Sequence, residues 1–270
     1  MDNSKASSSS PTVKAPGTAS LSTQLRDCEK CGSPYDPMAV HGSDKSYPFT
    51  LCPACGAQYI AEKAKQDAAR KALDHENAIK RRANRLEQLL SQLVPWRFRD
   101  ASLADFPDAL TKPFRRLSGD GYVLYGPTGT GKTHLACAAM RYFLENTENL
   151  EAKGLPMFTT WDYLLLDIRR CFRQQSTESE LDVLEPYVGA EFLVLDDIGG
   201  STGFEQSESD FGLRIFTYVI GERLNELRPT VITTNRTRQA TENAFGDRVA
   251  SRLSTFEWIG CGGKDRRVTS

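Results

Sequence analysis

The stretch that most constrains this chain reads GPTGTGKT, at Gly126–Thr133. It matches G-x-x-x-x-G-K-[ST] at every defined position, a pattern typical of a loop that binds nucleotide phosphates. Its glycines let backbone N–H groups approach a polyphosphate closely. Lys132 would place a positive charge on the outer phosphates, and the hydroxyl of Thr133 would be an oxygen ligand of Mg²⁺. The predicted cofactor-binding residues are Gly126, Pro127, Thr128, Gly129, Thr130, Gly131, Lys132, Thr133 and His134.

The residues on either side of the loop support this interpretation. Gly121–Tyr125 is a short, apolar, β-prone run, and His134–Glu145 has the composition and periodicity of a helix. A helix that begins at the loop directs its free N–H groups and the positive end of its dipole at the phosphates. The combination of strand, loop and helix therefore predicts a nucleoside triphosphate site.

Two further predicted strands end in polar side chains. Glu191–Asp197 is an apolar run that ends in two carboxylates, and Thr230–Asn235 is a β-branched run that ends in an amide. We expect Asp196 to hold Mg²⁺ together with Thr133, and Asp197 to orient or deprotonate the attacking water. Asn235 could position that water or sense the γ-phosphate.

Arg248 and Arg252 lie four residues apart, on one face of a predicted helix. Guanidinium groups that are not needed in their own site suit the γ-phosphate of a neighbouring subunit, as an arginine finger supplied in trans. A surface salt-bridge pair is an equal alternative. With Lys132, Asp196, Asp197 and Asn235, these arginines complete the predicted catalytic set.

Four of the seven cysteines form two C-x-x-C-G motifs. A redox dithiol needs only one such pair, and disulfides are disfavoured in the reducing cell interior, where a nucleotide-hydrolysing domain belongs. The spacing is typical of a four-thiolate zinc site, which is structural because it leaves no open position for a substrate. The predicted zinc ligands are Cys28, Cys31, Cys52 and Cys55.

Composition divides the chain into four predicted segments. Residues 1–24, rich in Ser, Thr, Pro and Ala, form a disordered tail; 25–58 form a zinc-ribbon module; 59–94 form a long helix and linker; and 95–270 form an ATPase domain. The long helix is expected because residues 59–93 contain no Gly or Pro. Its charge run, which we interpret as a solvated face that could alternatively touch phosphate, comprises Lys80, Arg81, Arg82 and Arg85.

The overall composition fits a globular protein. Hydrophobic residues make up 39% of the 270 residues, and the formal net charge is −1, so a nucleic-acid contact would need a local basic patch. No apolar run reaches the ~18 residues of a membrane span, and the N-terminus lacks a signal-peptide pattern. We therefore expect a cytoplasmic protein.

The order of these motifs resembles the AAA+ ATPases, and within them the helicase loaders of the DnaC and DnaI type together with the transposition helper IstB. The resemblance implies an α/β core with a five-stranded parallel sheet. We expect no C-terminal lid, because only about 17 residues follow Leu253, and the loaders that the chain resembles likewise lack one. By position, Asn235 resembles the sensor residue and Arg252 the finger, with Arg248 beside it. The resemblance rests on Trp96–Ser102, the phosphate loop, Leu195–Gly199, Thr234–Asn235 and Asp247–Leu253.

In this family a helical insertion after the second strand faces single-stranded DNA, and here it would be Trp161–Gln175. The alternative is a plain amphipathic helix, and both can hold at once. The N-terminal ends of such loaders grip the replicative helicase, but DnaC itself has no cysteine cluster, so the likeness before Val94 is one of architecture alone. The implied DNA-binding residues are Arg169, Arg170, Phe172 and Arg173.

The sequence thus predicts an ATP-dependent helicase loader that uses ATP, Mg²⁺ and Zn²⁺. Subunits would assemble on single-stranded DNA in a ring or spiral through Arg252, and hydrolysis would release the helicase. Turnover is expected to be slow and regulatory, because Asp197 stands where many AAA+ proteins have Glu. One alternative is an IstB-like helper ATPase that binds DNA and a transposase. The other is a zinc-dependent adaptor whose nucleotide site is purely structural.

Overall fold

The computed structural model describes residues 25–37, 47–116, 121–150, 155–172, 177–199 and 209–263. The chain divides into two compact units, Met1–Asn77 and Ala78–Ser270, which are considered separately. The predicted tail, residues 1–24, and Arg173 lie outside the described residues. Among the described helices, none has both the length and the apolar content needed to cross a membrane.

The first unit contains a small hairpin and the start of a long helix. Strands β1 (Arg26–Asp27) and β2 (Pro34–Tyr35) pair antiparallel, and helix α2 runs from Pro53 to Leu93. The helix begins at Pro53, earlier than the predicted start near Tyr59. Proline is tolerated in the first turn of a helix, where its missing N–H would have no partner, so Pro53 can be the first helical residue, and Gly56 lies inside the helix. The second cysteine pair therefore lies at a helix start and not on a second ribbon turn.

The second unit is built on a five-stranded sheet in the order β4-β5-β6-β3-β7, and every neighbouring pair is parallel. This confirms the predicted α/β core with its five-stranded parallel sheet. The strand over Gly121–Tyr125 matches its predicted bounds, and the strand over Thr230–Thr234 ends one residue before the predicted Asn235, because both are short, β-branched or aromatic runs bounded by turn residues. The predicted strand Glu191–Asp197 is observed as Leu193–Ile198. The strands are β3 (Gly121–Tyr125), β4 (Met157–Thr160), β5 (Leu193–Ile198), β6 (Thr230–Thr234) and β7 (Glu257–Gly260).

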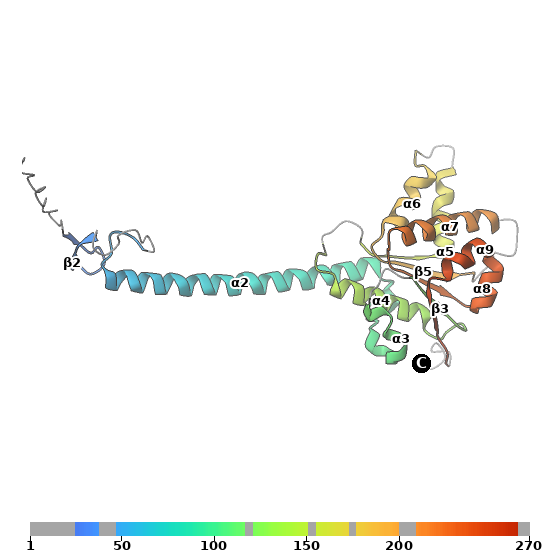
Figure 1. The fold of residues 1–270 in the computed structure, drawn as a ribbon, viewed down its shortest axis with the longest axis horizontal. Helices are drawn as coiled ribbons and strands as arrows, with labels where there is room; N and C mark the ends of the chain where they lie inside the picture. The colour runs from blue at the N-terminus through green and yellow to red at the C-terminus, as the bar shows by residue number, and fades with distance from the viewer. Residues whose placement is uncertain are drawn as a thin grey trace, which may run out of the picture. The chain divides into compact units, whose positions relative to one another are not determined.

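Helices cover both faces of this sheet, and β3 and β5 lie between α4 on one side and α7 on the other (Figure 1). Short 3-10 turns lead from α2 into the sheet: η1 (Trp96–Phe98), η2 (Leu103–Asp105) and η3 (Phe114–Arg116). The helices are α3 (Asp108–Thr111), α4 (Lys132–Asn146), α5 (Trp161–Arg169) with η4 (Arg170–Phe172), α6 (Glu180–Gly189), α7 (Ser209–Asn225), α8 (Arg238–Phe245) and α9 (Asp247–Leu253).

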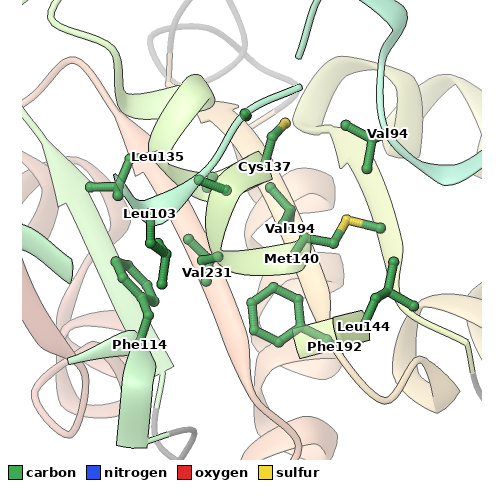
Figure 2. Close-up of a cluster of buried hydrophobic side chains, with 14 of the residues drawn as sticks. Val94, Leu103, Phe114, Leu135, Cys137, Met140, Leu144, Phe192, Val194 and Val231 are labelled. Atoms are coloured by element: carbon green, nitrogen blue, oxygen red, sulfur yellow. The ribbon is translucent and has the colours of Figure 1, made fainter. Parts of the chain in front are cut away.

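Alternation along the strands divides the hydrophobic core in two. Tyr122 and Leu124 of β3 face a cluster that includes Leu135 and Met140 of α4 and the end of α2 (Figure 2). Val123, between them, faces a second cluster formed with α5, α6, α7 and α9. Both faces of a parallel sheet are normally covered in this way. The carboxyl ends of the strands are thereby fixed at one edge, where the polar side chains collect.

Arg82 of α2 caps the C-terminus of α4. Its guanidinium donates to the carbonyl oxygens of Glu145 at 2.7 Å, Thr147 at 2.9 Å and Glu148 at 3.4 Å. A cation at this end of a helix satisfies carbonyls without an intrahelical partner and interacts favourably with the dipole. Arg82 is exposed, as the predicted solvated face requires, but its guanidinium also makes a structural contact that the sequence analysis did not predict.

We expect Arg82→Ala to loosen the last turn of α4. The free energy of unfolding should fall by about 0.5–1 kcal/mol and no more, because the guanidinium is exposed and its interactions are partly screened by solvent. Hydrogen exchange of the full chain should be faster at the end of α4 and in residues 78–93, whereas the exposed neighbouring change Arg81→Ala should leave it unaltered. Equal exchange in the two variants would show that the cap contributes nothing.

Candidate active site and metal centre

The phosphate loop joins the end of β3 to the start of α4. Gly126 has a φ of +144°, and a Cβ at this position would lie 2.2 Å from the carbonyl oxygen of Cys261, so only glycine fits. The N–H of Cys261 donates to the carbonyl oxygen of Tyr125 at 2.7 Å. The segment after β7 therefore fixes the beginning of the loop. At its other end, α4 begins at Lys132, and a helix N-terminus in this place favours a bound phosphate.

Lys132 is buried and ties the loop to the end of β6. Its Nζ donates to the carbonyl oxygens of Gly126 at 2.9 Å and Pro127 at 2.8 Å, and to Oδ1 of Asn235 at 2.7 Å. Asn235 in turn donates from Nδ2 to Oδ1 of Asp197 at 3.0 Å. The predicted lysine, sensor amide and second acid thus form one hydrogen-bonded chain across β5 and β6.

Asp196 is buried beside the loop and accepts hydrogen bonds from two threonines. Thr133 Oγ1 lies 2.9 Å from Oδ1 and 3.1 Å from Oδ2 of Asp196, and Thr233 Oγ1 donates to Oδ1 at 2.6 Å. Burial raises the pKa of Asp196, while the two hydroxyl donors oppose that shift. The carboxylate and hydroxyl oxygens converge on one point, and hard oxygen ligands are what Mg²⁺ prefers. The residues present therefore fit the ion that the family implies.

Asp197 occupies a strained backbone conformation at the end of β5. Its φ is +57°, which is unusual for a residue other than glycine, and its N–H donates to Thr233 Oγ1 at 2.8 Å. The pairing of β5 with β6 changes register between Leu195 and Ile198. In a regular strand consecutive side chains point to opposite faces. The irregularity lets Asp196 and Asp197 line the same cleft.

One cleft of about 390 Å³ collects these groups. It is also lined by three residues that the sequence analysis did not assign to a site, Arg97 and Phe98 of η1 and Thr233 of β6. The ring of Phe98 lies 5.9 Å from that of His134, and His134 Nε2 lies 3.2 Å from Asp105 Oδ2. The lining comprises Arg97, Phe98, Thr128, Gly129, Gly131, Lys132, Thr133, His134, Asp196, Asp197, Thr233 and Asn235.

Arg248 and Arg252 lie outside this cleft. Both line a separate groove of about 920 Å³ between α7 and α9, which contains none of the phosphate-loop residues. Arg252 is half-buried and its Nη1 donates to the carbonyl oxygen of Arg248 at 3.1 Å, whereas the Arg248 side chain is exposed. The structure therefore separates the two arginines from the nucleotide cleft of their own chain.

Helix α5 has one face in the core and one at the surface. Leu164 and Ile168 are buried and Leu165 is partly buried against the same cluster, as the amphipathic alternative predicted, and Trp161 is buried there as well. The α-helix ends at Arg169 and the 3-10 turn η4 follows, whereas the rest of the predicted segment, residues 173–175, lies outside the described residues. Phe172 is 61% exposed. Arg170 forms an ion pair with Asp167 at 2.8 Å on the same surface.

The four predicted zinc ligands come together in the first unit. Cys28 and Cys31 lie in the turn between β1 and β2, and Cys52 and Cys55 lie at the start of α2. All four Sγ atoms lie within 4.8 Å of one another, and those of Cys31 and Cys52 are 3.7 Å apart. Tetrahedral Zn–S bonds of about 2.3 Å require sulfur separations of about 3.8 Å. The thiols are therefore placed to hold a zinc ion.

The protein environment shifts the pKa values of these thiols in opposite directions. Backbone hydrogen bonds, chiefly from Cys52, lower the pKa of the Cys28 thiol to about 6, whereas burial raises the pKa of the Cys55 thiol to about 12. A bound metal would keep all four as thiolates. Protons then compete with the metal, so its affinity must fall as the pH falls.

The parallel sheet, the loop before α4 and the acids at the strand ends define a P-loop ATPase fold of the AAA+ class. A family model described as IstB-like ATP binding protein matches residues 118–253, half of the chain. The matched region runs from just before β3 to the end of α9 and so includes every residue that lines the cleft except Arg97 and Phe98. The chain belongs to this family of IstB-like ATP binding proteins.

Several curated relatives carry the name replicative helicase loader DnaC. The chain is 30% identical over 132 residues to that of Escherichia coli strain K12, which covers 49% of each chain. It is 28% identical over 144 residues to that of Buchnera aphidicola subsp. Schizaphis graminum, covering 51% of this chain and 54% of the relative. The chain therefore spans about half the length of the curated relatives it matches.

Solved structures share the fold. The crystal structure of the DnaC helicase loader superposes with a TM-score of 0.50 at 23% identity, covering 62% of this chain and 100% of the other. Domain III of the Thermotoga maritima replication initiation protein DnaA superposes with a TM-score of 0.50 at 20% identity, covering 62% and 69%. Both likenesses concern the arrangement of the elements alone.

Proposed function

We propose that this protein is an ATP-dependent helicase loader of DNA replication in the cytoplasm. It would assemble on single-stranded DNA and deliver or release a replicative DNA helicase. The observation that carries the proposal is the 30% identity to a protein named replicative helicase loader DnaC over 132 residues. The complete set of lysine, acid and amide groups in one cleft supports an active ATPase in that role.

The proposed reaction converts ATP and water to ADP and phosphate. Lys132 would exchange its loop carbonyls for the outer phosphates, and Thr133 and Asp196 would hold Mg²⁺. When bound, this ion neutralises charge on the phosphates that bracket the broken bond. Asp197, held by Asn235, would orient the attacking water or accept its proton. The short side chain of Asp197 supports slow, regulatory turnover.

The groove between α7 and α9, which Arg248 and Arg252 line, supports a proposal of self-association. Arg252 would contact the γ-phosphate bound by a neighbouring copy, since it lies outside the cleft of its own chain. Because such a finger acts only in the assembled state, ATP turnover would rise with protein concentration. Subunits would thus join in a ring or spiral around the nucleotide.

The outer surface of α5 and η4 would contact single-stranded DNA. Phe172 would stack on a base, and Arg169 and Arg170 would lie near phosphates. Arg173, which is outside the described residues, would continue the set.

We expect Phe172→Ala to weaken binding of single-stranded DNA about 5- to 150-fold, since one stacked base contributes about 1–3 kcal/mol. Fluorescence anisotropy with a labelled oligothymidylate, in ATP and at fixed salt, measures this. Leu181→Ala, another exposed apolar change, should bind as the wild type does; equal affinity of all three proteins would exclude stacking by Phe172.

The N-terminal unit would hold the helicase. A metal bound by its four cysteines would order the hairpin and the start of α2, and the exposed surface of α2 that follows would contact the partner.

The loading test uses the full chain, the hexameric replicative helicase of the same genome and covalently closed circular single-stranded DNA. Helicase should be recovered on the circles only with this protein and ATP, and not with the Lys132→Ala variant. If the protein adds nothing to helicase recovery, it is not a loader of that helicase.

The family match to IstB-like proteins favours one second candidate, an ATPase that binds duplex DNA and delivers a transposase. A transposase gene beside this one would support it. The same preparation, tested with that transposase and linear duplex DNA, should then show ATP-dependent delivery. Delivery of the transposase without any effect on the helicase would replace the loader proposal.

A further inference from the structure

A glycine lies in the interior of α7, one turn before the helix ends. Glycine is among the least favourable residues inside a helix, because it loses the most backbone freedom on folding. Gly221 has no positive φ that would require it. Its neighbours supply the reason: a Cβ at Gly221 would lie 3.1 Å from Nε of Arg252 and 3.6 Å from its Nη2. The guanidinium of Arg252 lies on the helix backbone where a larger residue would crowd it.

A second contact holds the same guanidinium from the other side of the groove. Nη1 of Arg252 donates to the carbonyl oxygen of Arg248, one turn earlier on α9. The Arg252 side chain is therefore half-buried between α7 and α9. Arg248 lines the same groove, but its side chain is exposed. The two arginines, of which the resemblance to the loaders favoured Arg252 as the finger, are thus held very differently.

We infer that Gly221 is a positioning residue, which seats Arg252 and makes it, and not Arg248, the arginine that acts on the nucleotide of a neighbouring copy. This rests on the proposed trans-acting arginine. A long flexible side chain that is already held in one orientation loses less freedom when it meets its target. The absence of a side chain at Gly221 thus leaves room for the Arg252 guanidinium in the orientation that catalysis needs. Gly221 itself touches neither substrate nor reacting atoms.

The test is a double-substitution cycle on the full chain, with ATP turnover measured at saturating ATP and high protein concentration. Gly221→Ala should lower turnover roughly 3- to 10-fold, since a displacement of a few tenths of an ångström misplaces the guanidinium. Arg252→Ala should lower it about 100-fold or more. In the Arg252→Ala background, Gly221→Ala should add no further loss. Ser254→Ala, an exposed change just after α9 and outside the groove, is the control and should turn over as the wild type does.

A merely structural role would give a different result. Alanine is a better helix former than glycine, so the Tm of Gly221→Ala should be unchanged or higher while its turnover falls. Nucleotide affinity at low protein concentration should stay unchanged. Unaltered turnover in Gly221→Ala, or an equal loss with and without Arg252, would overturn the inference. If Gly221→Ala does not fold, Arg252→Lys replaces it as the test, because lysine keeps the charge but lacks the guanidinium that Gly221 accommodates. Turnover of Arg252→Lys equal to that of the wild type would then overturn the inference.

The outcomes also separate this inference from the proposal on which it rests. If Arg248→Ala abolishes turnover and Arg252→Ala does not, the finger acts in trans but Gly221 does not seat it. If neither arginine affects turnover while Lys132→Ala abolishes it, the trans-acting arginine itself is wrong. Both results overturn the role of Gly221, and only the second also removes the proposed subunit contact.

Discussion

Lys132→Ala should lower ATP turnover by about 100-fold or more, the usual consequence of removing a preorganised charge from a transition state. The substitution removes the cation placed for the outer phosphates and also the bridge from Gly126 and Pro127 to Asn235. Nucleotide affinity should fall as well, because a lysine in this position interacts with the phosphates before and during transfer. Phosphate release and calorimetric titration with ATP measure the two effects.

The exposed change Lys112→Ala is the matched control for this experiment, because it alters the net charge of the chain equally. It should bind and hydrolyse ATP as the wild type does. The competing idea, a zinc-dependent adaptor with a purely structural nucleotide site, predicts that Lys132→Ala keeps full biological function. Retention of helicase delivery by this variant would favour the adaptor over both ATPase proposals.

Cys28→Ser should unfold the small N-terminal module and abolish its zinc binding. The buried cluster of this unit consists of Cys28, Tyr35, Cys52 and Cys55, with Leu51 packed against it. A core of this size cannot stabilise a fold alone, and in zinc-dependent modules metal binding contributes about 10–16 kcal/mol of apparent free energy to the folded state. Zinc content and NMR spectra of the full chain measure the loss.

The same variant should still bind ATP, because the cleft belongs to the second unit. Cys171→Ser, a half-buried cysteine outside the cluster, is the control and should keep its zinc. Chelation of the wild-type protein should reproduce the effect of Cys28→Ser, and restored zinc should reverse it. A well-dispersed spectrum for residues 25–37 without metal would contradict a structural role for zinc.

The elements around the nucleotide cleft could be predicted from sequence because each carries a local signal. β3 and β6 occupy the predicted strands, and α4 begins at Lys132, two residues before the predicted His134. The juxtaposition of Asp196 with Thr133 follows from the same logic, since carboxyl ends of parallel strands meet at one edge. The structure brings these predicted residues together, and their chemical roles stay predictions.

Other features depend on contacts between distant segments and left no local signal. Arg97 and Phe98 line the cleft although they precede the loop by about 30 residues, and their segment supports the family resemblance without indicating that position. Arg82 was indistinguishable from its charged neighbours until α4 was placed beside it. The role of Gly221 was likewise not indicated by the sequence, because only the contact with the Arg252 side chain explains a glycine there. Composition predicts elements well, but tertiary contacts decide which side chains of an element have a task.

The most direct test of the central claim mixes two inactive proteins. Lys132→Ala keeps Arg252 but cannot use its own ATP, and Arg252→Ala keeps an intact cleft but lacks the arginine. If the nucleotide lies between copies of the chain, the mixture should regain ATP turnover, because Arg252 of one copy completes the cleft of another. Turnover of the mixture no greater than that of the separate variants, or full turnover of Arg252→Ala alone, would contradict a nucleotide site shared between subunits.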